Sequence, residues 1–124
     1  MKHSTTTPTA AEAERMDRLS RMPCIACQIR LTNSPLGPSQ PSRTTIHHLV
    51  DRGYRKHSGG HMATIPLCEW HHQGICLAGE TSGTMTRLYG PSLALDKRLF
   101  VETYQPERYL LMMTNAALAM METT

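Results

Sequence analysis

The sequence is poor in aromatic residues. It has one Phe and one Trp among 124 residues, and Phe, Trp and Tyr together make up 5%. A chain of this length forms one domain, and with so few large side chains its apolar core must be small. Small cores usually need a metal ion or disulfides as additional support. The composition therefore argues against a fold held together by apolar packing alone.

Long hydrophobic runs are also missing. No apolar stretch approaches the ~20 residues that a membrane-spanning helix requires. The start, Met1-Lys2-His3-Ser4, has no apolar signal-peptide core. These absences predict a cytoplasmic protein without a membrane partner. In a reducing compartment, the four cysteines are expected to be metal ligands or free thiols rather than disulfides.

The chain has no large excess of charge, since its net charge is +3, but the charges are unevenly placed. Residues 1–78 hold nine Lys and Arg against five Asp and Glu, which leaves +4. Residues 79–124 hold four against five, which leaves −1. The basic excess lies with the cysteine and histidine motifs, so a polyanion could approach that part of the chain.

Two short cysteine motifs have the spacing of zinc half-sites. Cys24 and Cys27 form a CxxC, and Cys68 and His71 form a CxxH. Each spacing lets a tight turn aim two ligands at one point, so the four residues predict a structural Zn²⁺ site with a closed tetrahedral shell. The competing interpretation is buried or free thiols with a surface histidine. Cys76 is an alternative fourth ligand, although its distance from Cys68 is long for a half-site and a buried thiol is the simpler interpretation.

Three further histidines form a second group. His47 and His48 follow a β-branched run, so on a strand their side chains point to opposite sides. His72 directly follows the predicted zinc ligand and points away from the zinc. We expect His47 and His72 to share a catalytic divalent ion and His48 to take a proton from water. His61 could brace the loop that carries His48 or contact a phosphate.

The segment after the histidine doublet carries three cations. Arg52, Arg55 and Lys56 are candidates for contacts with the phosphates of DNA, which add affinity without reading sequence. The alternative for each of them is an ordinary charge on a solvated loop.

The residue pattern predicts an α+β fold. Thr44-Thr45-Ile46 and Ala63–Leu67 read as short strands on either side of an exposed loop, and Glu69–Ile75 reads as a helix. Ala11–Met22 is expected to form a short helix that ends before Pro23. Residues 1–20 are thus a flexible N-terminal tail with a short helix, and residues 21–124 are a single zinc-stapled domain.

Two helices are predicted after the Gly/Ser/Thr-rich stretch 79–84. The first begins near Pro91 and places Leu95, Leu99 and Phe100 on one face. The second begins at Pro106, with Glu107 suited to a positive helix N-terminus. The methionines of this second helix are expected to pack on the zinc core or to form a partner surface; they are Met112, Met113, Met120 and Met121.

The order CxxC, Ile46-His47-His48-Leu49 and Thr64-Ile65-Pro66-Leu67-Cys68-x-x-His71-His72 resembles the HNH endonucleases with their ββα-metal fold. Within them the chain is most similar to the phage recombination-enhancement (Ref) nuclease family, over about residues 22–112. The resemblance implies a phage or prophage origin, DNA as substrate and a RecA filament as partner. It also implies that His48 is the general base, that His61 holds the middle position, which is Asn in many HNH enzymes, and that His47 and His72 bind the catalytic ion.

The leading hypothesis is therefore a DNA endonuclease linked to recombination, with structural Zn²⁺ and catalytic Mg²⁺ or Mn²⁺. The alternative is a non-catalytic zinc module that binds nucleic acid or protein, in which the histidines only support the fold. Cleavage of RNA is a third possibility, because the same chemistry allows it.

Overall fold

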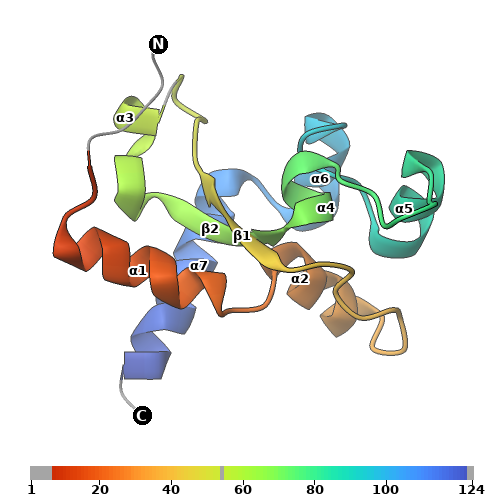
Figure 1. Ribbon diagram of the computed structural model, residues 1–124, viewed down its shortest axis with the longest axis horizontal. Coiled ribbons are helices and arrows are strands. Elements are labelled where there is room, and N and C mark those ends of the chain that lie inside the picture. Colours follow the sequence, from red (N-terminus) through yellow and green to blue (C-terminus); the bar gives the residue numbers. More distant parts are fainter. Residues whose placement is uncertain (1–6, 54, 123–124) are drawn as a thin grey trace.

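The computed structural model describes residues 7–53 and 55–122, apart from the side chains of residues 56 and 57. It is a small α+β fold, as predicted, with one two-stranded sheet surrounded by helices (Figure 1). The elements, in chain order, are α1 (Ala10–Ser20), α2 (Ile25–Asn33), β1 (Thr44–His48), α3 (Arg55–Ser58), η1 (Gly60–Met62), β2 (Thr64–Cys68), α4 (Glu69–Gln73), α5 (Ser82–Tyr89), α6 (Lys97–Tyr104) and α7 (Glu107–Glu122).

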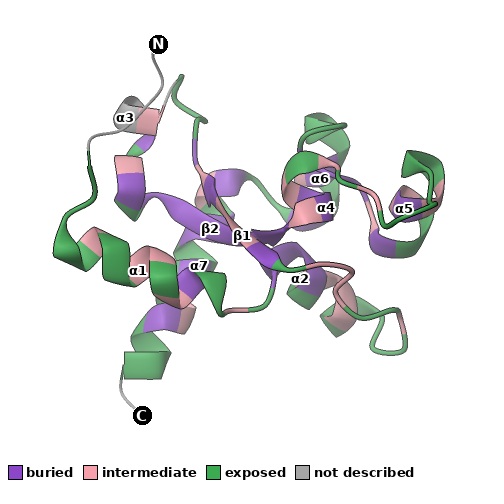
Figure 2. Cartoon of the chain, viewed as in Figure 1, coloured by how far each residue is buried: buried purple, intermediate pink, exposed green. Residues whose placement is uncertain are grey.

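The sheet is antiparallel and lies at the centre of the fold. His47 is paired with Ile65 and His48 with Thr64, so the histidine doublet ends β1 next to the start of β2. Every residue of β2 is buried (Figure 2), because α1, α2, α4 and α7 all contact this strand. Both strands lie within one residue or two of the predicted positions. A long loop with α3 and η1 joins them, and α4 follows β2 directly.

Helix α1 is packed onto the sheet. It begins at a capping box, in which the Thr9 side chain accepts from the Glu12 backbone and the Glu12 carboxylate accepts from the Thr9 backbone. Arg15 donates to the side chain and the carbonyl of Thr64 in β2 and to the side chain of Asn115 in α7. Residues 10–20 are therefore tied to both the sheet and the last helix.

Leu19 of α1 provides a test of this attachment. Its side chain is fully buried, and truncation to Ala should cost about 2–5 kcal/mol of unfolding free energy. Leu36 is a matched control, because it is fully exposed and its replacement by Ala should change stability by less than about 0.5 kcal/mol. Urea unfolding followed by circular dichroism measures both, and equal stabilities of the two variants would contradict the packing of α1.

The apolar core is small and continuous with the cysteine motifs. Trp70 is fully buried in α4, and its indole nitrogen donates to the Gly90 carbonyl at 2.9 Å. Phe100 and Tyr104, one turn apart on α6, fill the space beside His71. Cys24, Cys27 and Cys68 belong to the same buried cluster as these aromatic side chains. The stability of the core is therefore expected to depend on the metal that the thiols bind.

Three α-helices were not predicted from the sequence. The one-turn helix α3 lies in the segment that was expected to be an exposed loop. Helix α2 begins inside the CxxC, with Cys24 as its N-cap, and helix α5 lies in the Gly/Ser/Thr-rich segment, with Thr81 as its N-cap. The composition of the second segment is typical of a loop, but Met85 and Tyr89 lie four residues apart and bury one face of α5 in the core. Tertiary burial thus overrides the weak local preference for helix.

The apolar face of α6 also differs from the prediction. The helix begins at Lys97, after Asp96 as N-cap, and not near Pro91. Leu95 and Leu99 are exposed, whereas Phe100 is buried. Leu95 precedes the helix and Leu99 is adjacent to Phe100, so the inward face consists of Phe100 and Tyr104, which lie one turn apart.

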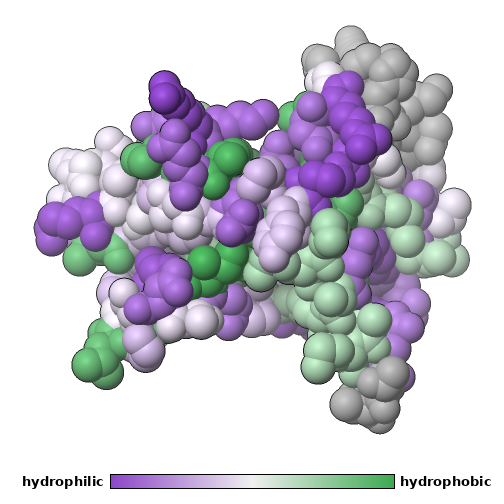
Figure 3. Space-filling view, turned by 180° about the vertical axis from the view of Figure 1, so that it is seen from behind, coloured by the Kyte–Doolittle hydropathy of each residue, from purple (hydrophilic) through white to green (hydrophobic). Residues whose placement is uncertain are grey.

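The methionines of α7 were expected to pack on the core or to form a partner surface, and the structure leaves them exposed. The inward face of α7 consists of Leu110, Leu111, Thr114 and Leu118. The exposed methionines give a moderately hydrophobic surface, visible over α7 when the molecule is seen from behind (Figure 3); they are Met112, Met113, Met120 and Met121. Among the described helices, none has the length and apolar character needed to cross a bilayer.

Candidate functional site

The two cysteine motifs converge on one point. Their four ligand atoms lie within 4.8 Å of one another, and all four residues are buried. Nδ1 of His71 lies 3.5 Å from Sγ of Cys24, 3.5 Å from Sγ of Cys27 and 3.3 Å from Sγ of Cys68. Ligand atoms of a tetrahedral zinc, with Zn–S near 2.3 Å and Zn–N near 2.0 Å, lie about 3.5 Å apart. The cluster can hold a structural metal such as zinc, and its four members are the ones predicted.

The hydrogen-bond partners of His71 determine which of its ring nitrogens carries the proton and which faces the thiols. Its other nitrogen, Nε2, lies 2.7 Å from the carbonyl of Tyr89, which can only accept, so Nε2 carries the proton. The Tyr104 hydroxyl donates to the same carbonyl at 2.9 Å. In the neutral ring Nδ1 therefore has its lone pair toward the thiols, as a metal ligand requires. A side chain at Gly90, which has a φ of 86°, would collide with the Tyr104 hydroxyl.

The ionisable groups of the cluster shift one another's pKa. Burial raises the pKa of Cys24, while hydrogen bonds from Cys24 and Cys27 hold the pKa of Cys68 well below its ordinary value. Burial alone would lower the pKa of His71, but hydrogen bonds with Cys27 and Cys68 raise it to about 9. Metal binding therefore displaces protons from the cluster. Cys76 is outside this group and packs as a partly buried side chain against the core.

The structure also brings His47 and His72 together. Their ring centroids are 5.0 Å apart, with the planes at 74°. His47 comes from the end of β1 and His72 from α4, where it follows His71 and so faces away from the thiols. Two imidazoles that each place a nitrogen about 2.1 Å from one ion have centroids about 5 Å apart. The pair therefore has the separation that a shared ion needs.

His48 and His61 form a second histidine pair. Nε2 of His48 lies 3.0 Å from Nδ1 of His61, and the rings meet edge to face. Since adjacent residues of a strand face opposite sides, His48 points away from His47, as predicted. Burial, and after it the positive charge of Arg55, lower the pKa of His48 to about 4. The ring is neutral at pH 7 and so can accept a proton.

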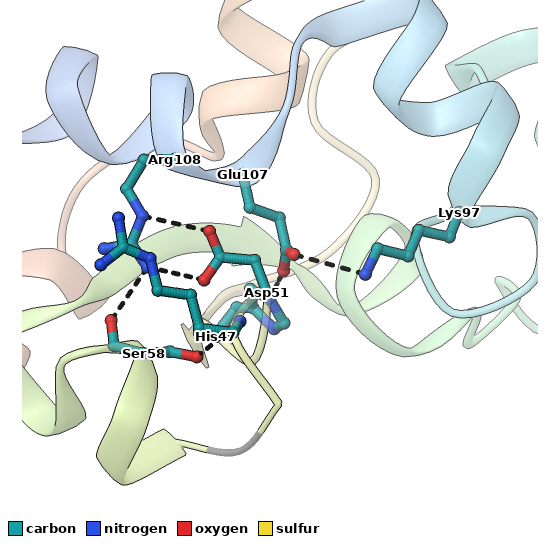
Figure 4. Close-up of polar contacts among 7 residues, drawn as sticks. His47, Asp51, Ser58, Lys97, Glu107 and Arg108 are labelled. Atoms are coloured by element: carbon teal, nitrogen blue, oxygen red, sulfur yellow. Dashed lines mark hydrogen bonds and ion pairs between the residues drawn. The ribbon is translucent and has the colours of Figure 1, made fainter.

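Sequence reasoning missed Glu107 as a part of this site. It begins α7, its side chain is 2% exposed, and its carboxylate lies 2.5 Å from Nε2 of His47 (Figure 4). Lys97 of α6 approaches the other carboxylate oxygen at 3.7 Å. The sequence predicted only that Glu107 suits the start of a helix. Its contact with His47 has no local sequence signal, because the two residues are 60 positions apart.

The loop between the strands is anchored beside the histidines. Arg108 of α7 donates twice to the Asp51 carboxylate and once to the Ser58 carbonyl (Figure 4). Arg52 is exposed and Arg55 half-buried. The charge of Arg55 lowers the pKa of His72 as well as that of His48, after the larger effect of burial, so the guanidinium lies near both histidines. The side chain of Lys56 lies outside the described residues.

Comparison with known proteins finds a family that spans both the cysteine cluster and the histidines. The family model described as recombination enhancement, RecA-dependent nuclease matches residues 8–119. The chain belongs to this family. The match covers the sheet, the cysteine cluster and both histidine pairs, and it confirms the predicted similarity to the recombination-enhancement nucleases. The family name indicates a nuclease that acts in recombination and depends on RecA. No solved structure matches the chain.

Proposed function

We propose that this member of the RecA-dependent nuclease family is a metal-dependent endonuclease of the HNH type that hydrolyses phosphodiester bonds of DNA. The observation that carries the proposal is that the ring centroids of His47 and His72 lie 5.0 Å apart, next to the hydrogen-bonded pair of His48 and His61. In this proposal, β1, β2 and α4 form the ββα-metal core of that type; their order along the chain supports it.

The roles of the histidines follow from their positions. His48, neutral at pH 7, takes a proton from the attacking water. His61 holds the His48 ring in place through the 3.0 Å hydrogen bond between them. The water oxygen attacks phosphorus, the bond from phosphorus to the 3′-oxygen breaks, and the 5′-phosphate remains on the other product.

His47 and His72 would hold the divalent ion. Neutral imidazole is a ligand for first-row divalent metals, so the donor set suits Mn²⁺ and, with phosphate oxygens completing the shell, Mg²⁺. When bound, such an ion supplies electrostatic stabilisation of the phosphate and of the leaving oxygen. Burial lowers the pKa of His72 to about 4, which keeps its ring neutral and available at physiological pH.

Arg52, Arg55 and Lys56 would contact DNA phosphates. They add affinity and not base recognition, so we propose low sequence specificity. From the family description we also propose a RecA filament as partner. A phage or prophage origin remains the proposal implied by the sequence resemblance.

A plasmid-nicking assay with Mg²⁺ or Mn²⁺, with and without RecA, tests the proposed activity. Nicked or linear plasmid that requires the added ion supports it, and a requirement for RecA supports the partner. Parallel assays on single-stranded DNA, duplex DNA and RNA define the substrate. Intact plasmid under all these conditions would leave the non-catalytic zinc module as the better account.

Replacing Arg55 by Ala tests the DNA-binding loop. Loss of one phosphate contact should reduce the slope of log Kd against log salt by about 1. Arg87→Ala is the matched control, because Arg87 is exposed on α5, at the opposite end of the molecule from α3 (Figure 1). Fluorescence anisotropy with a short duplex, without added divalent ion, measures both. Equal slopes for the two variants would remove Arg55 from the interface.

A further inference from the structure

We infer that Thr45 and Glu107 are positioning residues that fix opposite tautomers in the two imidazoles of the proposed catalytic metal site. His72 is locked with its proton on Nδ1 and His47 with its proton on Nε2. The nitrogens presented to the ion are therefore Nε2 of His72 and Nδ1 of His47. This inference rests on the proposed function, since it specifies how the same site binds its metal.

The assignment for His72 follows from the single proton of the Thr45 hydroxyl. Oγ1 of Thr45 lies 2.7 Å from the carbonyl of Leu67 and 2.8 Å from Nδ1 of His72. The carbonyl can only accept, so the hydroxyl donates its proton there. Nδ1 of His72 must then carry a proton and donate to Oγ1. The lone pair of the neutral ring is left on Nε2.

The assignment for His47 follows from the Glu107 carboxylate. An ionised carboxylate only accepts, so at 2.5 Å it takes a hydrogen bond from Nε2–H of His47. The carboxylate of Glu107 lies in the first turn of the 16-residue helix α7 and 3.7 Å from the Lys97 ammonium, and both interact favourably with a negative charge. The lone pair of the neutral His47 ring is left on Nδ1.

Glu107 acts through His47 and is not itself a third ligand. Among the described residues, the group of three or more His, Cys, Asp or Glu side chains placed to hold one ion is the cysteine cluster with His71, whose ligand atoms lie within 4.8 Å of one another. Glu107, His47 and His72 do not converge in this way. A carboxylate that accepts from the far nitrogen of a metal-binding imidazole orients the ring and increases its basicity. The carbonyl of Tyr89 has the same relation to His71 in the zinc cluster.

The wild-type protein alone can decide the tautomers. Long-range ¹H–¹⁵N correlation spectra of the zinc-loaded protein, at pH 8 and without a second metal, distinguish protonated from unprotonated ring nitrogens. We expect a proton on Nε2 of His47 and on Nδ1 of His72, with the other nitrogen of each ring bare. A proton on Nδ1 of His47, or on Nε2 of His72, would overturn the inference.

Variants test the consequence for metal affinity. Thr45→Val removes the acceptor for His72 at nearly constant volume, and Glu107→Gln removes the charge that orients His47. Each should weaken Mn²⁺ binding, measured by electron paramagnetic resonance, about 10- to 100-fold with the structural zinc retained. Thr45→Ser keeps the hydroxyl and should restore affinity. Glu102→Gln is the control for Glu107, since Glu102 is an exposed residue of α6. Unchanged Mn²⁺ affinity in Thr45→Val and Glu107→Gln would refute the positioning roles.

The outcomes also separate this inference from the proposed function. If the predicted tautomers and Mn²⁺ affinities are found but no nucleic acid is cut, the metal site stands and the endonuclease proposal fails. If the protein cuts DNA with the reverse tautomers, the endonuclease proposal stands and the positioning roles fail.

Discussion

Replacing Cys24 by Ser should unfold the domain. Cys24 is fully buried, caps α2 and lies 3.5 Å from His71, so the thiol cluster joins α2 to β2 and α4. Through the Tyr89 carbonyl and the Tyr104 hydroxyl, the same cluster also holds α5 and α6. Structural zinc contributes roughly 10–16 kcal/mol of apparent binding free energy, which is comparable with the ~5–15 kcal/mol total stability of a domain.

The matched control for this variant is Cys76→Ser. Cys76 is partly buried and outside the cluster, so its replacement should keep one zinc per chain and a cooperative thermal transition. Cys24→Ser should lose both, as measured by elemental analysis and circular dichroism, and chelation of zinc from the unaltered protein should do the same. A folded, cooperative Cys24→Ser variant would show that apolar packing suffices and that the cluster is not the main support of the core.

Replacing His48 by Ala should abolish DNA cleavage while the fold remains. Positioned general bases contribute typically ~10²–10⁴-fold to rate, so single-turnover nicking should fall by about that factor or below detection. The side chain is half-buried at the end of β1, and its described hydrogen bond is to His61 and not to the cysteine cluster. Truncation should therefore leave zinc content intact and the melting temperature close to that of the unaltered protein.

His61→Ala provides the comparison within the same pair. If His61 only holds the base in place, its loss should reduce cleavage less than the loss of His48, with Mn²⁺ affinity unchanged in both. DNA binding, measured without added divalent ion, should be retained by both variants. Undiminished cleavage by His48→Ala would assign the base to another group. An unaltered protein that binds DNA but never cuts it would favour the binding module.

Local spacing was sufficient to predict the cysteine cluster. A CxxC or a CxxH needs only one turn of chain to aim two ligands at one point, so the pairs Cys24 with Cys27 and Cys68 with His71 could be read directly. The same holds for the strands, because β-branched runs and the alternation of sides place His47 and His48 on opposite faces. The resemblance to the recombination-enhancement nucleases rested on these motifs and was confirmed over residues 8–119.

The contacts that orient the histidines, and the formation of α5, depend on how the helices pack. Glu107 reaches His47 across 60 residues of chain, and Tyr89 reaches His71 across 18, so neither contact follows from a local pattern. Helix α5 forms in a segment whose composition is that of a loop because the core buries Met85 and Tyr89. The residues that bind metal can be recognised from their spacing along the chain. The orientation of their side chains depends on hydrogen bonds to residues that are distant in the sequence and become neighbours only in the folded protein. For this reason, the residues predicted to bind metal were found from the chain, and those that set the direction of their lone pairs were found from the structure.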